Sequence, residues 1–225
     1  MPLVSKLGSA LPTSGCDDAK GNRPALLNQN ITTRAAGKLR TQAKVLGGTL
    51  ALMWLVFAAT ALSGDTLLRL GIIPRTASGL RGIFFAPFLH GSLAHIMANS
   101  IPFVVLGWLV MLRDARHFVP VTLAAMLGSG VLAWLLGAPG SVHIGASGVI
   151  FGYLGFLILS GWFARSFFSI LLSILVTALW GGMVLGVVPG ESGISWQAHL
   201  GGFLGGVLAA SMFKESRPGD RLLLS

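Results

Sequence analysis

The charged residues of this sequence lie at its two ends and in short segments between long uncharged stretches. The first such stretch, residues 45–64, has twenty residues without a charge. At 1.5 Å per residue, a helix of that length crosses an apolar core of about 30 Å. Only 10% of the 225 residues are charged, whereas a soluble domain averages about 25%. The pattern therefore predicts a membrane protein that crosses the bilayer several times.

Charges, prolines and glycines divide the apolar sequence into six predicted helices. The predicted spans cover about 45–64, 92–112, 118–136, 147–164, 167–188 and 195–213. We therefore expect an all-α, polytopic bundle of six transmembrane helices in residues 45–213. Residues 1–44 are polar and are predicted to form a disordered tail, and residues 214–225 a second, short tail. The first segment lacks the apolar core and cleavage site of a secretory signal, so the first span is interpreted as a retained anchor.

Basic residues in alternate loops predict the orientation of the bundle. With a cytoplasmic N-terminus, the inner side carries seven Lys or Arg in the tail, Arg113 and Arg116, Arg165, and three after the sixth helix. The outer side carries Arg69, Arg75 and Arg81. Both termini are therefore expected in the cytoplasm. The second, fourth and sixth helices then all begin at the outer surface.

A single serine, Ser147, lies where the fourth predicted helix begins, in the sequence Gly-Ala-Ser-Gly. Serine is a favoured N-cap, and capping alone is one explanation of its position. Gly148 and Gly152 have the small-xxx-small spacing that allows two membrane helices to approach closely. A base on such a neighbouring helix would instead make Ser147 a candidate nucleophile.

The sixth predicted helix supplies a candidate base, His199, about one turn from its start. Gly202 and Gly206 follow at i+3 and i+7, so they share the face of the imidazole. Close packing of this face on Gly148 and Gly152 would bring His199 to the depth of Ser147. A nucleophile beside a base is the arrangement of covalent acyl transfer. The alternative is an interhelical hydrogen bond without chemistry.

Two polar residues in the second predicted helix are candidates for stabilising an oxyanion. His95 and Asn99 are spaced i and i+4, so both project from one face at similar depth. They offer an imidazole N–H and an amide, and acyl transfer needs such donors where negative charge develops. The alternative interpretation is a polar lock between helices.

Several other functions are not favoured by the sequence. No His-Glu-x-x-His motif is present and no carboxylate lies within an apolar span, which argues against zinc proteolysis and an aspartyl mechanism. Cys16 is the only cysteine, so neither a disulfide within the chain nor a cysteine metal cluster is possible. The net charge of +9 comes from tails and loops beside apolar runs, so nucleic-acid binding is not expected.

His117 and His143 are predicted to be solvated surface residues. We expect no cofactor and no metal.

Three motifs in the predicted order resemble those of the rhomboid family of intramembrane serine proteases over about residues 45–213. They are His90-x4-His95-x3-Asn99, Gly145-Ala-Ser147-Gly, and Ala198-His199-Leu-Gly-Gly202-x3-Gly206. The resemblance implies a six-helix bundle with a water-accessible cavity open to the outer face. It also implies a dyad of Ser147 as nucleophile and His199 as base, without an acidic third member. His95 and Asn99 would support the oxyanion, and His90 would tie the first loop to the bundle.

The sequence departs from some family members in two places. Phe151 lies where those members have a tyrosine packed against the catalytic imidazole, so ring packing survives without a phenol hydroxyl. The first loop is short and lacks the Trp-Arg pair of certain relatives.

The resemblance implies an intramembrane serine endopeptidase that cleaves transmembrane protein substrates near the outer boundary of the membrane. The expected partners are those substrates and membrane lipid, in a bacterial plasma membrane. A relative that binds membrane clients without proteolysis is the alternative. A channel or transporter would need polar residues along a whole pathway, whereas here they gather in the outer half.

Overall fold

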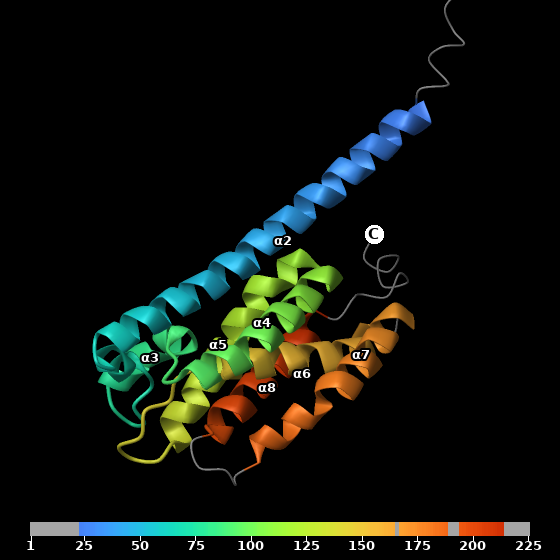
Figure 1. The fold of residues 1–225 in the computed structure, drawn as a ribbon. Coiled ribbons are helices and arrows are strands. Elements are labelled where there is room, and N and C mark those ends of the chain that lie inside the picture. The colour runs from blue at the N-terminus through green and yellow to red at the C-terminus, as the bar shows by residue number, and fades with distance from the viewer. Residues whose placement is uncertain (1–22, 165–166, 189–193, 214–225) are drawn as a thin grey trace, which may run out of the picture. The chain divides into compact units, whose positions relative to one another are not determined.

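A computed structural model describes residues 23–164, 167–188 and 194–213 of the chain. The described residues are helical apart from loops and one isolated backbone bridge between Ile72 and His143. This confirms the predicted all-α class. The six longest helices are α2 (Arg23–Leu62), α4 (Leu93–Arg113), α5 (Phe118–Leu136), α6 (Ser147–Ala164), α7 (Phe167–Trp180) and α8 (Trp196–Met212) (Figure 1).

The chain divides into two compact units, Met1–Thr41 and Gln42–Ser225. In the first unit, the described residues are helical from Arg23 onward. Helix α2 therefore begins before residue 45, where we predicted the first span to start, because polarity keeps a segment out of lipid but not out of a helix. Residues 23–44 are rich in Ala, Leu, Gln, Lys and Arg, which all favour helix. Residues 1–22 of the predicted first tail lie outside the described residues, and so does the whole of the predicted second tail, 214–225.

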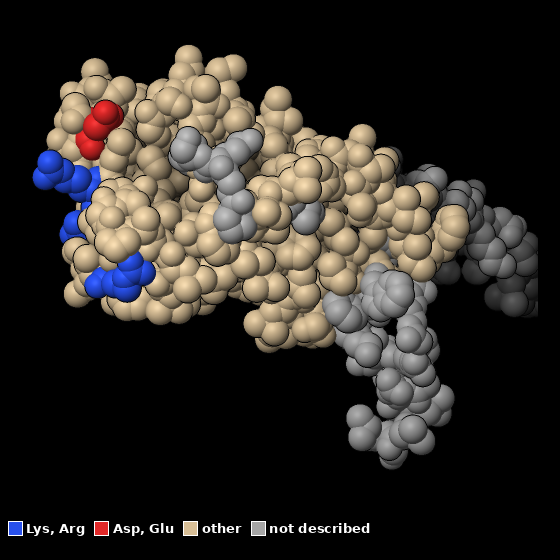
Figure 2. All heavy atoms as spheres, turned by 90° about the horizontal axis from the view of Figure 1, so that it is seen from below, with Lys and Arg blue, Asp and Glu red and all other residues tan. Residues whose placement is uncertain are grey.

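Among the described helices, three are long and apolar enough to cross a membrane. They are Ala35–Leu62, Leu93–Arg113 and Ala115–Leu136, and two shorter apolar helices cover Ser147–Gly161 and Ile170–Met183. On the face shown in Figure 2, charged side chains of the described residues gather at one end and the remaining surface is uncharged. Such an uncharged surface suits contact with lipid. The chain is an integral membrane protein, whereas six crossings remain a prediction.

Helix α7 ends earlier than the sequence predicted. We expected the fifth span to continue to about residue 188, but the α-helix stops at Trp180 and a 3-10 helix, η5 (Gly181–Val187), follows. Gly181 and Gly182 give little support to an α-helix because glycine is costly in a helix interior. The tighter geometry of η5 changes where the backbone carbonyls of this segment point.

Helix α6 is central in the second unit and packs against α4, α5, α7 and α8 (Figure 1). Its side chains include several of the most deeply buried ones: Ile150, Tyr153, Leu154, Phe156 and Leu157. Burial in protein rather than in lipid explains why α6 can carry a polar residue at its first position. The same helix therefore forms both the core and one wall of the site described below.

Helix α8 has two glycine faces rather than the single one that we predicted. A Cβ atom at Gly202 or Gly206 would overlap the backbone carbonyl of Gly148 or Gly152 on α6. Gly201 and Gly205 lie against backbone carbonyls of α5 in the same way. Only glycine permits backbones to approach this closely. The Gly-Gly pairs therefore wedge α8 between α5 and α6.

The first loop is a series of short helices rather than an open chain. They are η1 (Thr66–Leu70), η2 (Ser78–Arg81), α3 (Gly82–Phe85) and η3 (Ala86–Phe88). Arg75 donates from its guanidinium to the Leu135 carbonyl at 2.8 Å, and Trp134 Nε1 donates to the Thr76 carbonyl at 2.8 Å. The first bond occupies a carbonyl at the end of α5, the second occupies a carbonyl of the loop, and together they attach the loop to the bundle.

Candidate active site

The loop before α6 places Ser147 at the first position of that helix. Gly145 has φ +109°, which side chains other than glycine rarely adopt, and its N–H donates to the Ala86 carbonyl at 2.8 Å. A Cβ atom there would also lie 2.5 Å from Nε2 of His95. Within the described residues, the Ser147 hydroxyl has no backbone N–H as partner, so it does not act as a helix cap.

Ser147 and His199 form a hydrogen-bonded pair. The Ser147 Oγ lies 2.8 Å from Nε2 of His199, which belongs to the first turn of α8. That turn begins at an N-cap, because the Ser195 hydroxyl accepts from the Ala198 N–H at 3.3 Å. The imidazole is buried, with 9% of its residue surface exposed. The structure thus brings together the two residues that the sequence predicted as nucleophile and base.

The second nitrogen of His199 contacts a backbone carbonyl that sequence reasoning missed. Nδ1 lies 3.0 Å from the Gly186 oxygen in η5. A carbonyl only accepts, so Nδ1 carries the proton and donates, which leaves Nε2 free to accept the Ser147 proton. The Gly186 carbonyl thus orients the ring as an acidic residue does in a triad. The glycines at 181, 182 and 186 were the only signal in the sequence.

Phe151 covers one face of the His199 ring. The ring centroids are 4.1 Å apart and the planes differ by 9°, so the rings stack. Phe151 is one turn after Ser147 on α6 and is 3% exposed. A Cβ at Gly186 would lie 3.0 Å from the end of the Phe151 ring and 3.2 Å from Nδ1 of His199. The absence of a side chain at Gly186 therefore lets η5, Phe151 and His199 meet.

His95 and Asn99 line the same cavity as Ser147 and His199. The cavity has a volume of about 860 Å³ and is also lined by Phe151 and the start of α8. Ser92 begins α4 as an N-cap, its hydroxyl accepting from the His95 N–H at 3.1 Å. Asn99 Nδ2 donates to the His95 carbonyl at 2.9 Å, which leaves its second amide hydrogen available. Within the described residues, neither side chain is bonded to Ser147 or His199.

The four predicted packing glycines lie in the same α6–α8 interface as this pair. Gly148 and Gly152 on α6 face Gly202 and Gly206 on α8 through their backbones. Gly148 also contacts the Ser129 side chain of α5, where a Cβ would overlap it. The close approach of the two helices sets the distance between the hydroxyl and the imidazole.

His143 and His117 are not the solvated surface residues that we predicted. His143 is half-buried, with Nδ1 2.7 Å from Ser195 Oγ and Nε2 3.0 Å from Ser141 Oγ. Burial lowers the pKa of His143 below its usual value, so it is neutral at pH 7. His117 stacks on Phe213 with centroids 4.4 Å apart. Their partners come from segments distant in the sequence, which local polarity does not reveal.

His90 is fully buried in the turn before α4 and lies edge-on to His95, with ring centroids 5.0 Å apart. Burial, together with the nearby His95, lowers its pKa to about 4, against the opposing effect of the Phe88 backbone. His90 is therefore neutral at pH 7. His90 lies between the first loop and α4, and the structural role that the resemblance implied for it stays a prediction.

The arrangement can perform covalent acyl transfer but offers no metal site. Within the described part of the chain, no group of three or more His, Cys, Asp or Glu residues could hold a metal ion. Cys16 lies outside the described residues. A hydroxyl bonded to a neutral imidazole, beside a cavity with amide and imidazole donors, matches the requirements for a serine nucleophile and its oxyanion.

Comparison with known proteins gives the family. A family model for the rhomboid domain matches residues 77–216. An uncharacterized protein of Mycobacterium tuberculosis is 41% identical over 199 residues, which cover 79% of this chain and 83% of that protein. RHOMBOID-like protein 1 of Arabidopsis thaliana is 30% identical over 139 residues, covering 58% of this chain and 34% of the relative. Rhomboid-like protease 5 of Toxoplasma gondii is 33% identical over 136 residues, covering 56% of this chain and 15% of the relative. Because the family model matches more than half of the sequence, the chain belongs to the rhomboid family.

Proposed function

We propose that this protein is an intramembrane serine endopeptidase that cleaves transmembrane protein substrates near the outer boundary of the membrane. The observation that carries the proposal is the 2.8 Å contact between Ser147 Oγ and His199 Nε2, with the Gly186 carbonyl holding the opposite nitrogen. Membership of the rhomboid family supports it, as does the relative of Toxoplasma gondii that is named a protease.

In the proposed reaction, Ser147 attacks a peptide carbonyl while His199 Nε2 accepts the hydroxyl proton. The Nδ1–H bond to Gly186 stabilises the imidazolium that results. His95, Asn99 and the free N–H groups at the start of α6 donate to the oxyanion. His199 then gives its proton to the leaving amine, and a water activated by His199 hydrolyses the acyl-enzyme.

A substrate helix must unwind locally before Ser147 can reach a carbonyl, because helical carbonyls are already hydrogen-bonded. The cavity contains polar groups from α4, α6 and α8 at the helix starts. We place these starts at the outer side of a bacterial plasma membrane, with both termini in the cytoplasm, from the count of basic residues. The partners would be transmembrane segments with small or helix-breaking residues, together with lipid.

The proposal is tested with the full chain in detergent and a model transmembrane substrate. We expect Ser147→Ala and His199→Ala each to lower the cleavage rate by about 10³-fold or more. Ser211→Ala is the matched control, since Ser211 lies near the end of α8 and donates only to the Leu208 carbonyl. Full cleavage by the Ser147→Ala variant would contradict the proposal. Binding of the substrate by wild-type protein without cleavage would instead support the client-binding alternative.

A further inference from the structure

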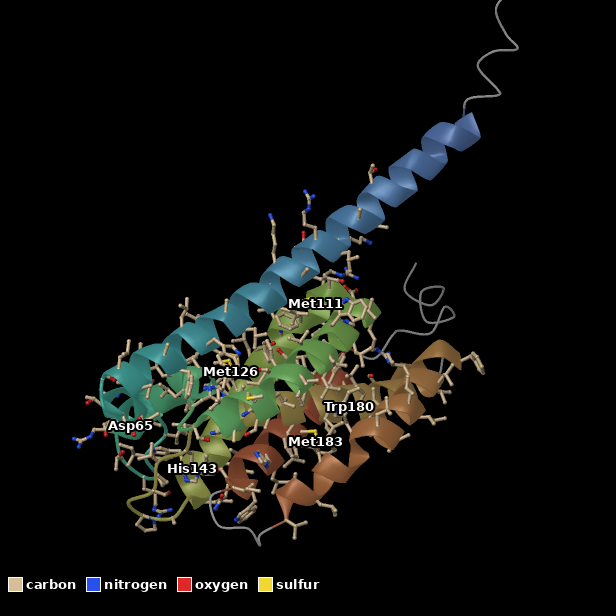
Figure 3. All side chains as sticks on the ribbon, viewed as in Figure 1. Asp65, Met111, Met126, His143, Trp180 and Met183 are labelled. Carbon is tan, nitrogen blue, oxygen red and sulfur yellow. The ribbon has the colours of Figure 1, made fainter. Side chains whose placement is uncertain are left out.

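A second serine–histidine contact lies beside the first, with the two residue types exchanged. His143, in the loop before α6, has its Nδ1 2.7 Å from the hydroxyl of Ser195, the N-cap of α8. Figure 3 shows His143 at the end of the bundle where α6 and α8 begin. His143 precedes Ser147 by four residues and Ser195 precedes His199 by four. Both contacts therefore join residues 52 apart in the chain.

The hydrogen-bond partners fix the direction of each bond around His143. The Ser141 hydroxyl donates to the Ala138 carbonyl at 2.7 Å, so it accepts from Nε2 of His143 at 3.0 Å, and Nε2 carries the proton of the neutral ring. Nδ1 therefore accepts from the Ser195 hydroxyl at 2.7 Å, and the Ser195 oxygen also accepts from the Ala198 N–H at 3.3 Å. A neutral His143 thus gives every hydroxyl and ring nitrogen in this series of hydrogen bonds a partner.

The loop that carries His143 is itself anchored on the other side. The backbone groups of His143 and Ile72 bond to each other at 2.9 and 3.0 Å. Three residues after Ile72, Arg75 donates its backbone N–H to the Trp134 carbonyl at 3.0 Å. The first loop and the end of α5 thus hold His143, and His143 holds the start of α8. A further contact from this turn, between Gln197 Nε2 and the Leu136 carbonyl, is longer at 3.3 Å and exposed.

We propose that His143 is a positioning residue, which through Ser195 holds the first turn of α8 so that His199 meets Ser147. The inference rests on the proposed function, and His143 itself takes no proton from the substrate. It goes beyond the dyad because the distance between Ser147 and His199 depends on where α8 begins as well as on the glycine contacts deeper in the bundle. Small misplacement of a reacting pair lowers rates by up to about 10²-fold.

Three substitutions at His143 separate its two bonds. Asn places an amide near the position of Nδ1 and can keep the bond to Ser195. Gln places its amide near the position of Nε2 and can keep only the bond to Ser141. Phe keeps the ring and loses both bonds.

The readout is the rate at which a small fluorophosphonate labels Ser147 in the full chain, because this reaction needs no substrate recognition. We expect His143→Phe and His143→Gln to lower the rate about tenfold, and His143→Asn to restore most of it. With the model substrate, kcat should fall while KM stays near the wild-type value. The thermal unfolding temperature of each variant is measured alongside, and Ser211→Ala is again the control.

The outcomes distinguish this inference from the proposed function. If wild-type protein is not labelled, the proposed function fails and the inference fails with it. Labelling of His143→Phe at the wild-type rate would overturn the inference alone. A raised KM with unchanged kcat and labelling would also overturn it, since His143 would then contact substrate. If His143→Phe does not fold, the Asn and Gln variants decide, and equal labelling of those two would contradict the proposal.

Discussion

Three neighbours hold the His199 imidazole around its ring. Nε2 contacts Ser147, Nδ1 contacts the Gly186 carbonyl, and Phe151 stacks on one face. A carbonyl carries only a partial charge, so it orients the ring without the strong attraction of a carboxylate for the imidazolium. Ring orientation should therefore depend more on packing here than in a triad.

The Phe151 stack can be tested by removing the ring. An aromatic contact contributes about 0.5–1.5 kcal/mol beyond its buried area, which corresponds to roughly two- to tenfold in rate. We expect Phe151→Leu to lower fluorophosphonate labelling of Ser147 by that factor, and Phe151→Tyr to stay near wild type because it retains the ring. Equal labelling of the Leu variant and wild type would show that the stack does not orient His199.

His90 predicts a pH dependence of stability. Its pKa is about 4 in the folded protein against 6.5 as the ordinary value, so the unfolded chain binds the proton more strongly. The free energy of unfolding is therefore unaffected by His90 above about pH 6.5. As the pH falls from there toward 4, it decreases by about 1.4 kcal/mol per pH unit. Unfolding temperatures at pH 7.5 and 5.0 should therefore differ more in wild type than in His90→Leu. The other histidines are common to both proteins, and an equal difference in both would contradict a buried neutral His90.

The residues of the dyad could be predicted because helical periodicity and glycine spacing are local signals. His199, Gly202 and Gly206 share a face by spacing alone, and Gly148 and Gly152 supply the complementary surface. The Gly186 carbonyl could not be predicted, because a backbone group carries no sequence signal and an α-helix there would have used it internally. His143 was missed for a related reason, since Ile72 and Ser195 are far from it in the sequence.

At the level of elements, the most extensive contact among the described helices is between α6 and α8. The Gly-Gly pairs of α8 allow its backbone to touch α5 on one side and α6 on the other. The structure thus explains why two adjacent glycines recur four residues apart, where a single packing face needs only one in each turn. The dyad spans this interface, so its geometry depends on helix separation.

A methyl group at this interface should disturb both stability and chemistry. We expect Gly202→Ala to lower the free energy of unfolding by about 1–3 kcal/mol and to lower labelling of Ser147, because its Cβ would meet the Gly148 carbonyl. Gly48→Ala in α2 is the control, since no atom lies within 4 Å of a Cβ there. Thermal unfolding and labelling rates of the two variants check this. A Gly202→Ala protein that matched the Gly48→Ala protein in both would contradict close packing of α6 on α8.

Element boundaries show what composition can and cannot predict. The predicted third span, 118–136, coincides with α5, because charges and a Pro-Gly segment bound it. The end of α7 was predicted wrongly, because uncharged residues continue through η5 although the helix type changes at Gly181. Hydropathy reports where lipid is tolerated, not which backbone hydrogen bonds form.

At the level of the whole molecule, the charges predict how the bundle lies in its membrane. The basic residues outside the spans favour cytoplasmic termini, and the cavity would then open to the outer side. Fusion of a reporter that is active only in the cytoplasm to residue 225 should give signal, whereas fusion of one active only outside should not. The reverse pattern would invert the topology and place the cavity on the cytoplasmic side.

The central claim is that Ser147 is a nucleophile activated by His199, and peptide-mapped mass spectrometry after fluorophosphonate treatment tests it most directly. We predict one phosphonyl adduct on the peptide containing Ser147 in the wild-type protein, and at least about 10³-fold slower adduct formation in His199→Ala. An adduct on a different serine, or equal labelling with and without the His199 imidazole, would contradict the account.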